Sequence, residues 1–199
     1  TLMANVENLV LTGTAAITGT GNALDNVLTG NSGSNNLSGG AGNDTLTGGA
    51  GNDFMNGGLG NDIYLLNRGD GLEQWTDNDS TAGNTDIARF GADIASDQIW
   101  FRKYGNYLEA HIIGTSDRTL VMNWYSSSAN HIERFESGLG AQFETYATQR
   151  IRGAMLDGLR ENDWLPRSLR REMRRIEAAI HELEQVVQRA PTESELANS

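Results

Sequence analysis

The sequence contains no cysteine, which excludes both a disulfide framework and a thiolate metal site. No apolar run approaches the roughly 18 residues of a membrane-spanning helix, and no N-terminal signal peptide is visible. We therefore predict a chain without a membrane span. The chain begins at Thr1 rather than at a methionine, which indicates a piece of a longer protein.

Motifs of common enzymes are also missing. Neither G-x-x-x-x-G-K-[ST] nor G-x-G-x-x-G occurs, so a phosphate-binding loop is not expected. No serine stands in a G-x-S-x-G elbow, and there is no H-E-x-x-H. His111 and His131 each precede an isoleucine in a strand-like segment, and we interpret them as ordinary strand histidines. We expect no enzymatic activity.

The charged residues and the glycines are distributed unevenly, and this divides the chain into two parts. The net charge of −11 argues against nucleic acid as the main partner of the whole chain. Residues 1–138 hold six Lys or Arg against 16 Asp or Glu, whereas residues 139–199 hold nine Arg against 10 acids. Of the 24 glycines, 20 precede residue 115. We predict two domains, 1–138 and 139–199.

A nine-residue unit is written three times in residues 39–65, with the form G-G-x-G-N-D-x-U-x, where U is a large apolar residue. Two decaying copies precede it, so the repeats span about residues 21–65. The apolar positions are Leu28, Leu37, Leu46, Met55 and Tyr64. The polar positions are Asn26, Asn35, Asp44, Asp53 and Asp62. A fixed period of this kind is the signature of a repeat architecture.

The unit predicts a metal-binding turn followed by a short strand. Its glycines permit positive φ, so the first six residues can form a tight turn, and x-U-x is a minimal strand with U inward. We predict that six turn glycines belong to the metal sites: Gly40, Gly42, Gly49, Gly51, Gly58 and Gly60. Successive turns would direct carbonyl oxygens and one carboxylate to a common point, a hard oxygen cage suited to Ca²⁺ rather than zinc or copper. A flexible Gly-rich linker would not keep this period.

The units resemble the RTX nonapeptide repeats of secreted bacterial toxins, proteases, lipases and adhesins. That resemblance implies a parallel β-roll in which two nonapeptides make one turn and calcium lies along both edges. Residues 18 apart would then share an edge, with Asp44 and Asp62 above Asn26, and Asp53 above Asn35. It further implies a secreted, non-catalytic module, exported by type I secretion, that folds when it meets calcium outside the cell.

The flanking segments also favour strands. Residues 5–29 indicate short first rungs that cap the repeat array. Beyond the repeats, Asp70 in the turn 67–71 is a candidate to close the last calcium site. Strands are expected at residues 86–90, 98–104, 107–113, 118–125 and 131–135, with Gly105-Asn106 as a hairpin turn. This region resembles the haemolysin-type segment that follows RTX repeats. The predicted fold is mainly β, followed by a separate α-helical tail.

Helical patterns begin after about residue 140. Apolar residues recur at helical spacing, and Pro166 suits the first turn of a helix that extends to about Ala190. In that helix an arginine stripe lies roughly opposite an apolar stripe. A solvated helix face is an alternative interpretation of the arginine stripe.

The segment FETYATQRIRGAMLDGLRENDWLPRSLRR, within residues 141–198, is similar to sigma factors of the flagellar type. The resemblance implies that Gln149, Arg150 and Arg152 face the promoter −10 region, and that Arg167, Arg170, Arg171 and Arg174 lie near DNA just upstream. DNA and RNA polymerase would then be partners, in the cytoplasm. The helices that clamp the polymerase should precede residue 141, where this chain has repeats instead. The second hypothesis is therefore a sigma-factor-like fragment within a chimera.

Overall fold

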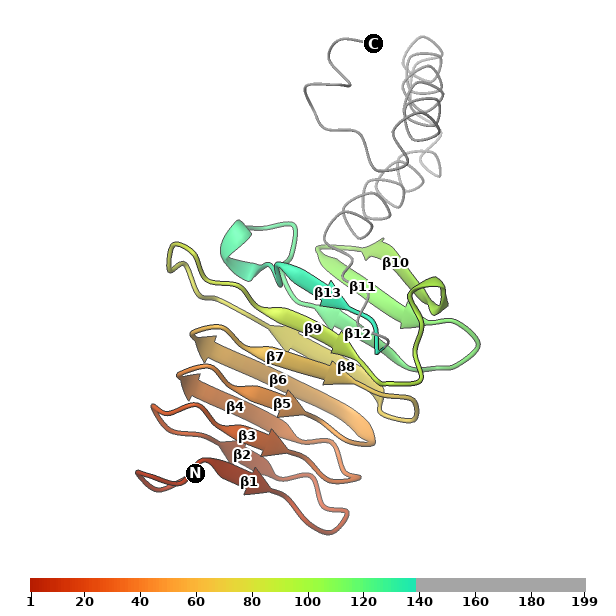
Figure 1. The fold of residues 1–199 in the computed structure, drawn as a ribbon. Coiled ribbons are helices and arrows are strands. Elements are labelled where there is room, and N and C mark those ends of the chain that lie inside the picture. The colour runs from red at the N-terminus through yellow and green to blue at the C-terminus, as the bar shows by residue number, and fades with distance from the viewer. Residues whose placement is uncertain (139–199) are drawn as a thin grey trace, which may run out of the picture. The chain divides into compact units, whose positions relative to one another are not determined.

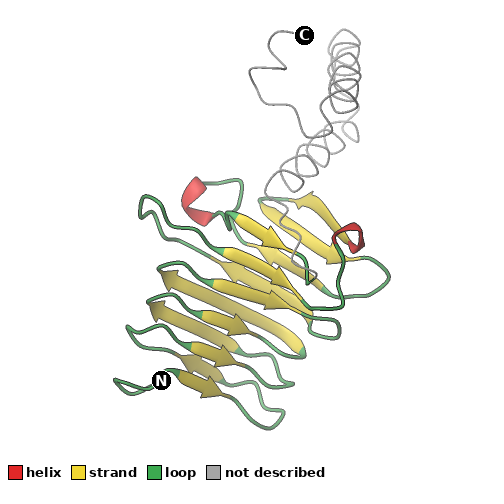
Figure 2. Cartoon of the chain, viewed as in Figure 1, coloured by secondary structure: helices red, strands yellow, loops and turns green. Residues whose placement is uncertain are grey.

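The computed structural model describes residues 1–138 as 13 strands and two short 3₁₀ helices, η1 (Ser96–Gln98) and η2 (Ser128–Asn130) (Figures 1 and 2). Strands that alternate along the chain lie in two different sheets. The first sheet has the order β1 (Asn8–Val10), β3 (Val27–Thr29), β5 (Thr45–Thr47), β7 (Ile63–Leu66), β9 (Ile87–Phe90) and β13 (Arg134–Glu136). All of its pairings are parallel.

The second sheet has the order β10 (Ile99–Tyr104), β11 (Tyr107–Ile112), β12 (Arg118–Val121), β8 (Gly71–Thr76), β6 (Gly51–Leu59), β4 (Asn36–Ala41) and β2 (Thr18–Thr20). The pairings along β2, β4, β6, β8 and β12 are parallel, whereas β10 and β12 both pair antiparallel with β11. The prediction of a mainly β fold with parallel sheets is confirmed. The predicted helical tail lies outside the described residues.

The register between neighbouring strands within the repeats is 18 residues. Asn36 pairs with Phe54 in the second sheet, and Thr45 pairs with Ile63 in the first. The chain therefore crosses from one sheet to the other every nine residues and returns to the same sheet every 18. Figure 1 shows the resulting stack, which rises from β1 strand pair by strand pair. This is the two-repeat turn that the sequence predicts.

The core between the sheets is built from the apolar position of each unit. All five of these residues are fully buried, and they come alternately from the two sheets: Leu28, Leu37, Leu46, Met55 and Tyr64. Trp75 and Ala88 continue the two rows, since they pair with Met55 and Tyr64 respectively. Trp75 stacks on Tyr64 with ring centroids 5.4 Å apart. One apolar residue in nine is thus enough to form a continuous core, because stacking buries each against its neighbours.

The lower end of the stack is formed by β1 and β2, as expected for the first rungs. Gly19 takes the inward position of β2 and pairs with Leu37. A Cβ at Gly19 would lie 2.9 Å from side-chain atoms of both Leu37 and Leu9, so the missing side chain leaves room for its neighbours. Val10 in β1 remains 64% exposed.

Beyond the repeats the register lengthens. Gly51 pairs with Gly71, and Ile63 pairs with Ile87. The five expected strands are present, but the fourth ends at Val121 and the fifth shifts to Arg134–Glu136. Gly105 and Asn106 connect β10 to β11 as the predicted hairpin, with Tyr104 opposite Tyr107.

The last strands close the upper end of the core. Phe135 of β13 is buried against Phe101 of β10, and the two rings meet edge-on with their centroids 4.9 Å apart. The ring of His131 stacks on that of Trp124, and its Nε2 lies 3.0 Å from the carbonyl oxygen of Trp124. Trp100 is 50% exposed. Within residues 1–138 we find no helix of the length and apolarity needed to cross a bilayer.

Candidate metal centre

One edge of the stack carries a ladder of polar side chains. The backbone N–H of Asn26 donates to Oδ1 of Asp44 at 2.7 Å, and that of Asp44 donates to Oδ1 of Asp62 at 2.8 Å. The N–H of Asp62 continues the ladder to Oδ1 of Asp86 at 2.7 Å. The structure thus brings Asn26, Asp44 and Asp62 together on one edge, at the predicted interval of 18 residues.

The opposite edge carries a second ladder. The backbone N–H of Asn35 donates to Oδ1 of Asp53 at 2.6 Å. Asp53 in turn pairs in register with Glu73 of β8. Asn35 and Asp53 therefore share an edge, as the two-repeat turn requires.

The second carboxylate oxygen of each repeat aspartate lacks a partner. Oδ2 of Asp44, Asp53 and Asp62 is buried, with no hydrogen-bond donor among the described residues. Buried polar atoms are normally hydrogen-bonded, so an orphan of this kind calls for an explanation. Because the orphans recur once per unit at the same atom, they point to one repeated ligand position.

Glycines line these orphan oxygens. A Cβ at Gly39 would lie 2.2 Å from Oδ2 of Asp44 and 2.5 Å from the carbonyl oxygen of Gly57. A Cβ at Gly48 would lie 2.4 Å from Oδ2 of Asp53 and 2.6 Å from Oε2 of Glu73. Two oxygens therefore flank the same point on each edge, and a side chain there would collide with both.

The glycines of the repeat adopt the predicted positive φ, but the predicted six-residue turn is too long, since Gly40 lies within β4 and Gly51 and Gly58 lie within β6. The six candidate turn glycines have φ between 86° and 142°: Gly40, Gly42, Gly49, Gly51, Gly58 and Gly60. Residues with a Cβ rarely adopt these angles. The turns reverse the chain between the sheets within a few residues, which keeps the aspartates of successive rungs in line.

The electrostatics of the first edge favour a cation. Burial raises the pKa of Asp44 to about 6 and that of Asp62 to about 7, and neighbouring carboxylates, including Asp86, contribute to the shift of Asp62. A buried, charged carboxylate among other carboxylates is unfavourable without a positive counter-charge. The buried oxygen donors of this edge therefore fit a bound Ca²⁺, whose preferred ligands are carboxylate and carbonyl oxygens.

On the second edge the structure places Glu73, which the sequence reasoning missed, at the position beside Asp53. Burial, together with the carboxylates of Asp53 and Asp70, raises the pKa of Glu73 to about 10. Asp70 lies in the turn before β8, where its Oδ2 accepts from the backbone N–H of Asn67 at 2.7 Å. Asp86 on the first edge was missed in the same way. Both lie beyond the nine-residue period, so counting by nines does not reach them.

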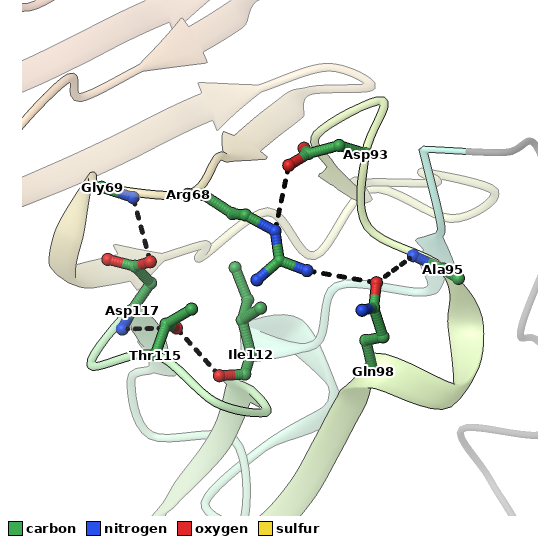
Figure 3. Close-up of polar contacts among 8 residues, drawn as sticks. All are labelled: Arg68, Gly69, Asp93, Ala95, Gln98, Ile112, Thr115 and Asp117. Carbon is green, nitrogen blue, oxygen red and sulfur yellow. Dashed lines mark hydrogen bonds and ion pairs between the residues drawn. The ribbon is translucent and has the colours of Figure 1, made fainter.

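A polar network holds the turn that contains Asp70. Figure 3 shows Asp117, which accepts a hydrogen bond from the backbone N–H of Gly69 at 2.9 Å. The backbone N–H of Gly71 donates to the same carboxylate at 3.0 Å. Arg68 reaches from the same turn to Asp93 at 3.0 Å and to Gln98 at 3.1 Å (Figure 3). These contacts tie the β7–β8 turn to the loops around β10 and β12.

The seven residues proposed to approach DNA lie outside the described residues: Gln149, Arg150, Arg152, Arg167, Arg170, Arg171 and Arg174.

Two family models match the chain. The RTX calcium-binding nonapeptide repeat, in four copies, matches residues 29–64. Sigma-70 region 2 matches residues 128–165. Both predicted resemblances are confirmed. The sigma-type match begins at residue 128, ahead of β13, so it includes residues that pack in the two-sheet stack.

The curated relatives resemble only part of the chain. RNA polymerase sigma factor FliA of Escherichia coli (strain K12) is 54% identical over 68 residues, which cover 34% of this chain and 28% of the relative. The protein of the same name from Salmonella typhimurium (strain LT2) is 52% identical over 68 residues, with the same coverage. RNA polymerase sigma-D factor of Bacillus subtilis (strain 168) is 47% identical over 66 residues, 33% of this chain and 26% of that protein. The chain thus spans less than a third of these relatives.

Proposed function

We propose that residues 1–138 form a calcium-binding β-roll of the RTX type, derived from a secreted bacterial protein, which folds on binding calcium and has no catalytic activity. The observation that carries the proposal is the buried, unpartnered Oδ2 of Asp44, Asp53 and Asp62. These oxygens recur at the period of the repeat and face glycine-lined positions. Ca²⁺ bound there would supply the positive charge that the buried carboxylates need.

Coupling of binding to folding follows from the same geometry. Each site takes atoms from two rungs of the stack, so it does not exist in the unfolded chain, and the free energy of binding adds to that of folding. Extracellular calcium modules typically have a Kd of about 10⁻⁴–10⁻³ M. An intracellular calcium concentration far below this range would leave the module unfolded until export.

Circular dichroism of the metal-free chain tests the proposal. We expect little β signal from residues 20–70 in chelator and a cooperative gain of β signal in a few millimolar CaCl₂. Equimolar MgCl₂ is the control, because Mg²⁺ demands a smaller octahedral shell. A spectrum that stays the same with chelator and with calcium would refute calcium-dependent folding.

A second candidate function rests on the 54% identity to a sigma factor. We propose that the tail is a sigma-factor fragment joined to the calcium module in a chimera, with promoter DNA and RNA polymerase as its partners. In that case the tail acts in the cytoplasm.

An electrophoretic mobility assay with the full chain separates the two candidates. If the tail acts like a sigma factor, we expect the chain to shift a duplex with a flagellar-type −10 element at a lower protein concentration than a scrambled duplex. The double substitution Arg150→Ala and Arg152→Ala should remove this preference. Equal weak binding of both duplexes would identify the arginines as a solvated helix face. The unbroken genomic reading frame across residue 128 would show whether the fusion exists in the organism.

A further inference from the structure

Three buried aspartates meet at the upper end of the first edge. Asp62, Asp77 and Asp86 each offer a carboxylate oxygen, and these three atoms lie within 4.8 Å of one another. The residues are 0%, 1% and 0% exposed respectively. Asp62 belongs to the last repeat, but Asp77 and Asp86 lie beyond the repeats, at the two ends of the loop that connects β8 to β9.

Local contacts hold this loop against the last rung. The hydroxyl of Tyr64 donates to the carbonyl oxygen of Thr76 at 2.9 Å and accepts from the N–H of Gly57 at 2.8 Å. This fixes the end of β8, and therefore Asp77, beside the rung that contains Asp62. At the other end of the loop, the amide of Asn84 donates to Oδ2 of Asp86 at 3.1 Å.

Two buried oxygens of the cluster have no hydrogen-bond partner among the described residues. Asp77 accepts from the N–H of Asp79 through Oδ2 at 3.3 Å, whereas its Oδ1 is buried and unpartnered, as is Oδ2 of Asp62. Three carboxylates in a buried space repel one another, and orphan oxygens among them lack the stabilisation that hydrogen bonds give elsewhere on the edge. A hard cation would relieve both problems.

We propose that Asp62, Asp77 and Asp86 form a terminal calcium site, outside the nonapeptide pattern, that fastens the β8–β9 loop to the last rung. The inference rests on the proposed calcium-binding function and adds a site that the repeat does not encode. Ca²⁺ binds oxygens at 2.3–2.6 Å, so two ligands of one ion are at most about 5 Å apart. The three oxygens lie within 4.8 Å of one another, so they are close enough to bind one ion.

The terminal site differs from the repeat sites in charge. Asp44 and Asp62 contribute two carboxylates to the pair of rungs that they join, whereas the terminal cluster contributes three. Calcium affinity rises with the number of charged ligands, so the terminal site should fill at the lowest calcium concentration. A filled terminal site would then hold the upper end of the stack while the weaker repeat sites exchange calcium.

Terbium luminescence of the full chain provides a local readout. Tb³⁺ replaces Ca²⁺ at oxygen sites and accepts excitation energy from a nearby aromatic ring. The hydroxyl of Tyr64 bonds to the carbonyl oxygen of Thr76, the residue before Asp77, so Tyr64 is the expected donor. Asp77→Asn removes one charge at nearly constant volume, and Asp97→Asn removes a charge from an exposed position as the matched control. We expect Asp77→Asn to weaken the tightest site at least about tenfold and to reduce the sensitised emission. Asp97→Asn should leave both unchanged.

The calcium-dependent β signal is measured in parallel, so the two proposals can fail separately. If Asp77→Asn binds with the same affinity and emission as Asp97→Asn while calcium still induces β structure, the terminal site is wrong and the repeat function stands. If the wild-type chain takes up neither ion, both proposals fall. If Asp77→Asn does not fold, anomalous scattering from wild-type crystals soaked in terbium tests the terminal site instead. A peak bonded to the Asp77 carboxylate supports the site, and peaks only at the repeat aspartates overturn it.

Discussion

The backbone N–H of Asp44 donates a hydrogen bond to Oδ1 of Asp62 at 2.8 Å, although 18 residues separate the two. One oxygen of the Asp62 carboxylate thereby holds two rungs in register, while the other is buried without a partner. The same side chain serves the fold and the proposed ion site. Disturbing either one should therefore disturb the other.

Removing single aspartates tests which rungs share an ion. Asp44 and Asp62 lie on one edge, so we expect Asp44→Ala and Asp62→Ala both to abolish the repeat site between their rungs. Asp62→Ala should also weaken the terminal site that Asp62 shares with Asp77 and Asp86, and the double variant should add little to Asp62→Ala. Asp53→Ala should spare that site and weaken the one on the opposite edge. Isothermal titration with CaCl₂ gives the number and affinity of sites for each variant.

The variant Asp97→Ala, which removes an exposed carboxylate, is the control for loss of charge alone. Loss of one common site in Asp44→Ala and Asp53→Ala, with Asp62→Ala unaffected, would contradict the assignment of ions to edges. The opposite edge pairs Asp53 with Glu73 rather than with a second aspartate. Since Glu73 must lose a proton to bind calcium as an anion, we expect that site to be the weaker one.

Substitution of a lining glycine should block calcium without touching a ligand. A Cβ at Gly57 would lie 2.1 Å from Oδ2 of Asp62, so Gly57→Ala should displace the ligand oxygen and raise the calcium concentration needed for folding at least about tenfold. Gly83→Ala is the control. Its Cβ would meet open space, and its φ of +88° adds only backbone strain of about 1 kcal/mol.

Both variants are compared by calcium titration of the β signal. If Gly57→Ala and Gly83→Ala require the same calcium concentration as each other, steric exclusion at the ligand oxygen is not the cause.

The pH dependence of the metal-free chain should be opposite to that of the calcium-bound chain. Burial raises the pKa of Asp44 to about 6 and that of Asp62 to about 7, above the ordinary value near 4. A carboxyl whose pKa is raised by folding stabilises the folded state most below its unfolded pKa, and this contribution is lost as pH rises through the folded pKa. The metal-free chain, which we expect to be largely unfolded at neutral pH, should therefore show more β signal at pH 5 than at pH 8.

Calcium binding requires deprotonated carboxylates, so its midpoint concentration should rise about tenfold or more between pH 8 and pH 5.5. Circular dichroism after exhaustive dialysis against metal-free buffer, and calcium titrations at each pH, measure the two trends. A metal-free β signal that increases from pH 5 to pH 8 would contradict the raised pKa values.

Two truncations test where the β unit ends. Residues 128–138 match Sigma-70 region 2, yet they contribute Phe135 to the core and the Glu133 carboxylate that accepts the N–H of Asp86 at 2.8 Å. A chain ending at residue 138 should keep the calcium response and the Tm. A chain ending at residue 127 should lose about 3 kcal/mol or more, since it removes a buried phenylalanine and a partly buried hydrogen bond.

Chemical denaturation in calcium compares the two. Equal stability would mean that β13 contributes nothing to the stack. If the chain ending at residue 138 lost its calcium response or its stability, the β unit would need residues beyond the predicted boundary.

The repeat region could be predicted almost completely, because each unit is local. Within residues 21–65, the inward apolar positions and the positive-φ glycines follow from counting, and the 18-residue register follows from the resemblance to RTX repeats. The structure bears them out at Leu46, Gly60 and the pair Asp44 and Asp62. Glu73 could not be assigned to the second edge in this way. It follows Asp53 by 20 residues, and a two-residue insertion is invisible to a period of nine.

The same limit applies more strongly at the upper end. The sequence by itself determined a regular stack of strands with acids at a fixed interval, because a constant repeat length imposes a constant register, and its resemblance to RTX repeats implied that the stack has two sheets. Only the tertiary structure decided that Asp77 and Asp86 meet Asp62, and that β12 and β13 return to lie beside β8 and β9. Those contacts join residues far apart in the chain through loops of irregular length, and side-chain packing in three dimensions, rather than sequence spacing, sets where such loops return.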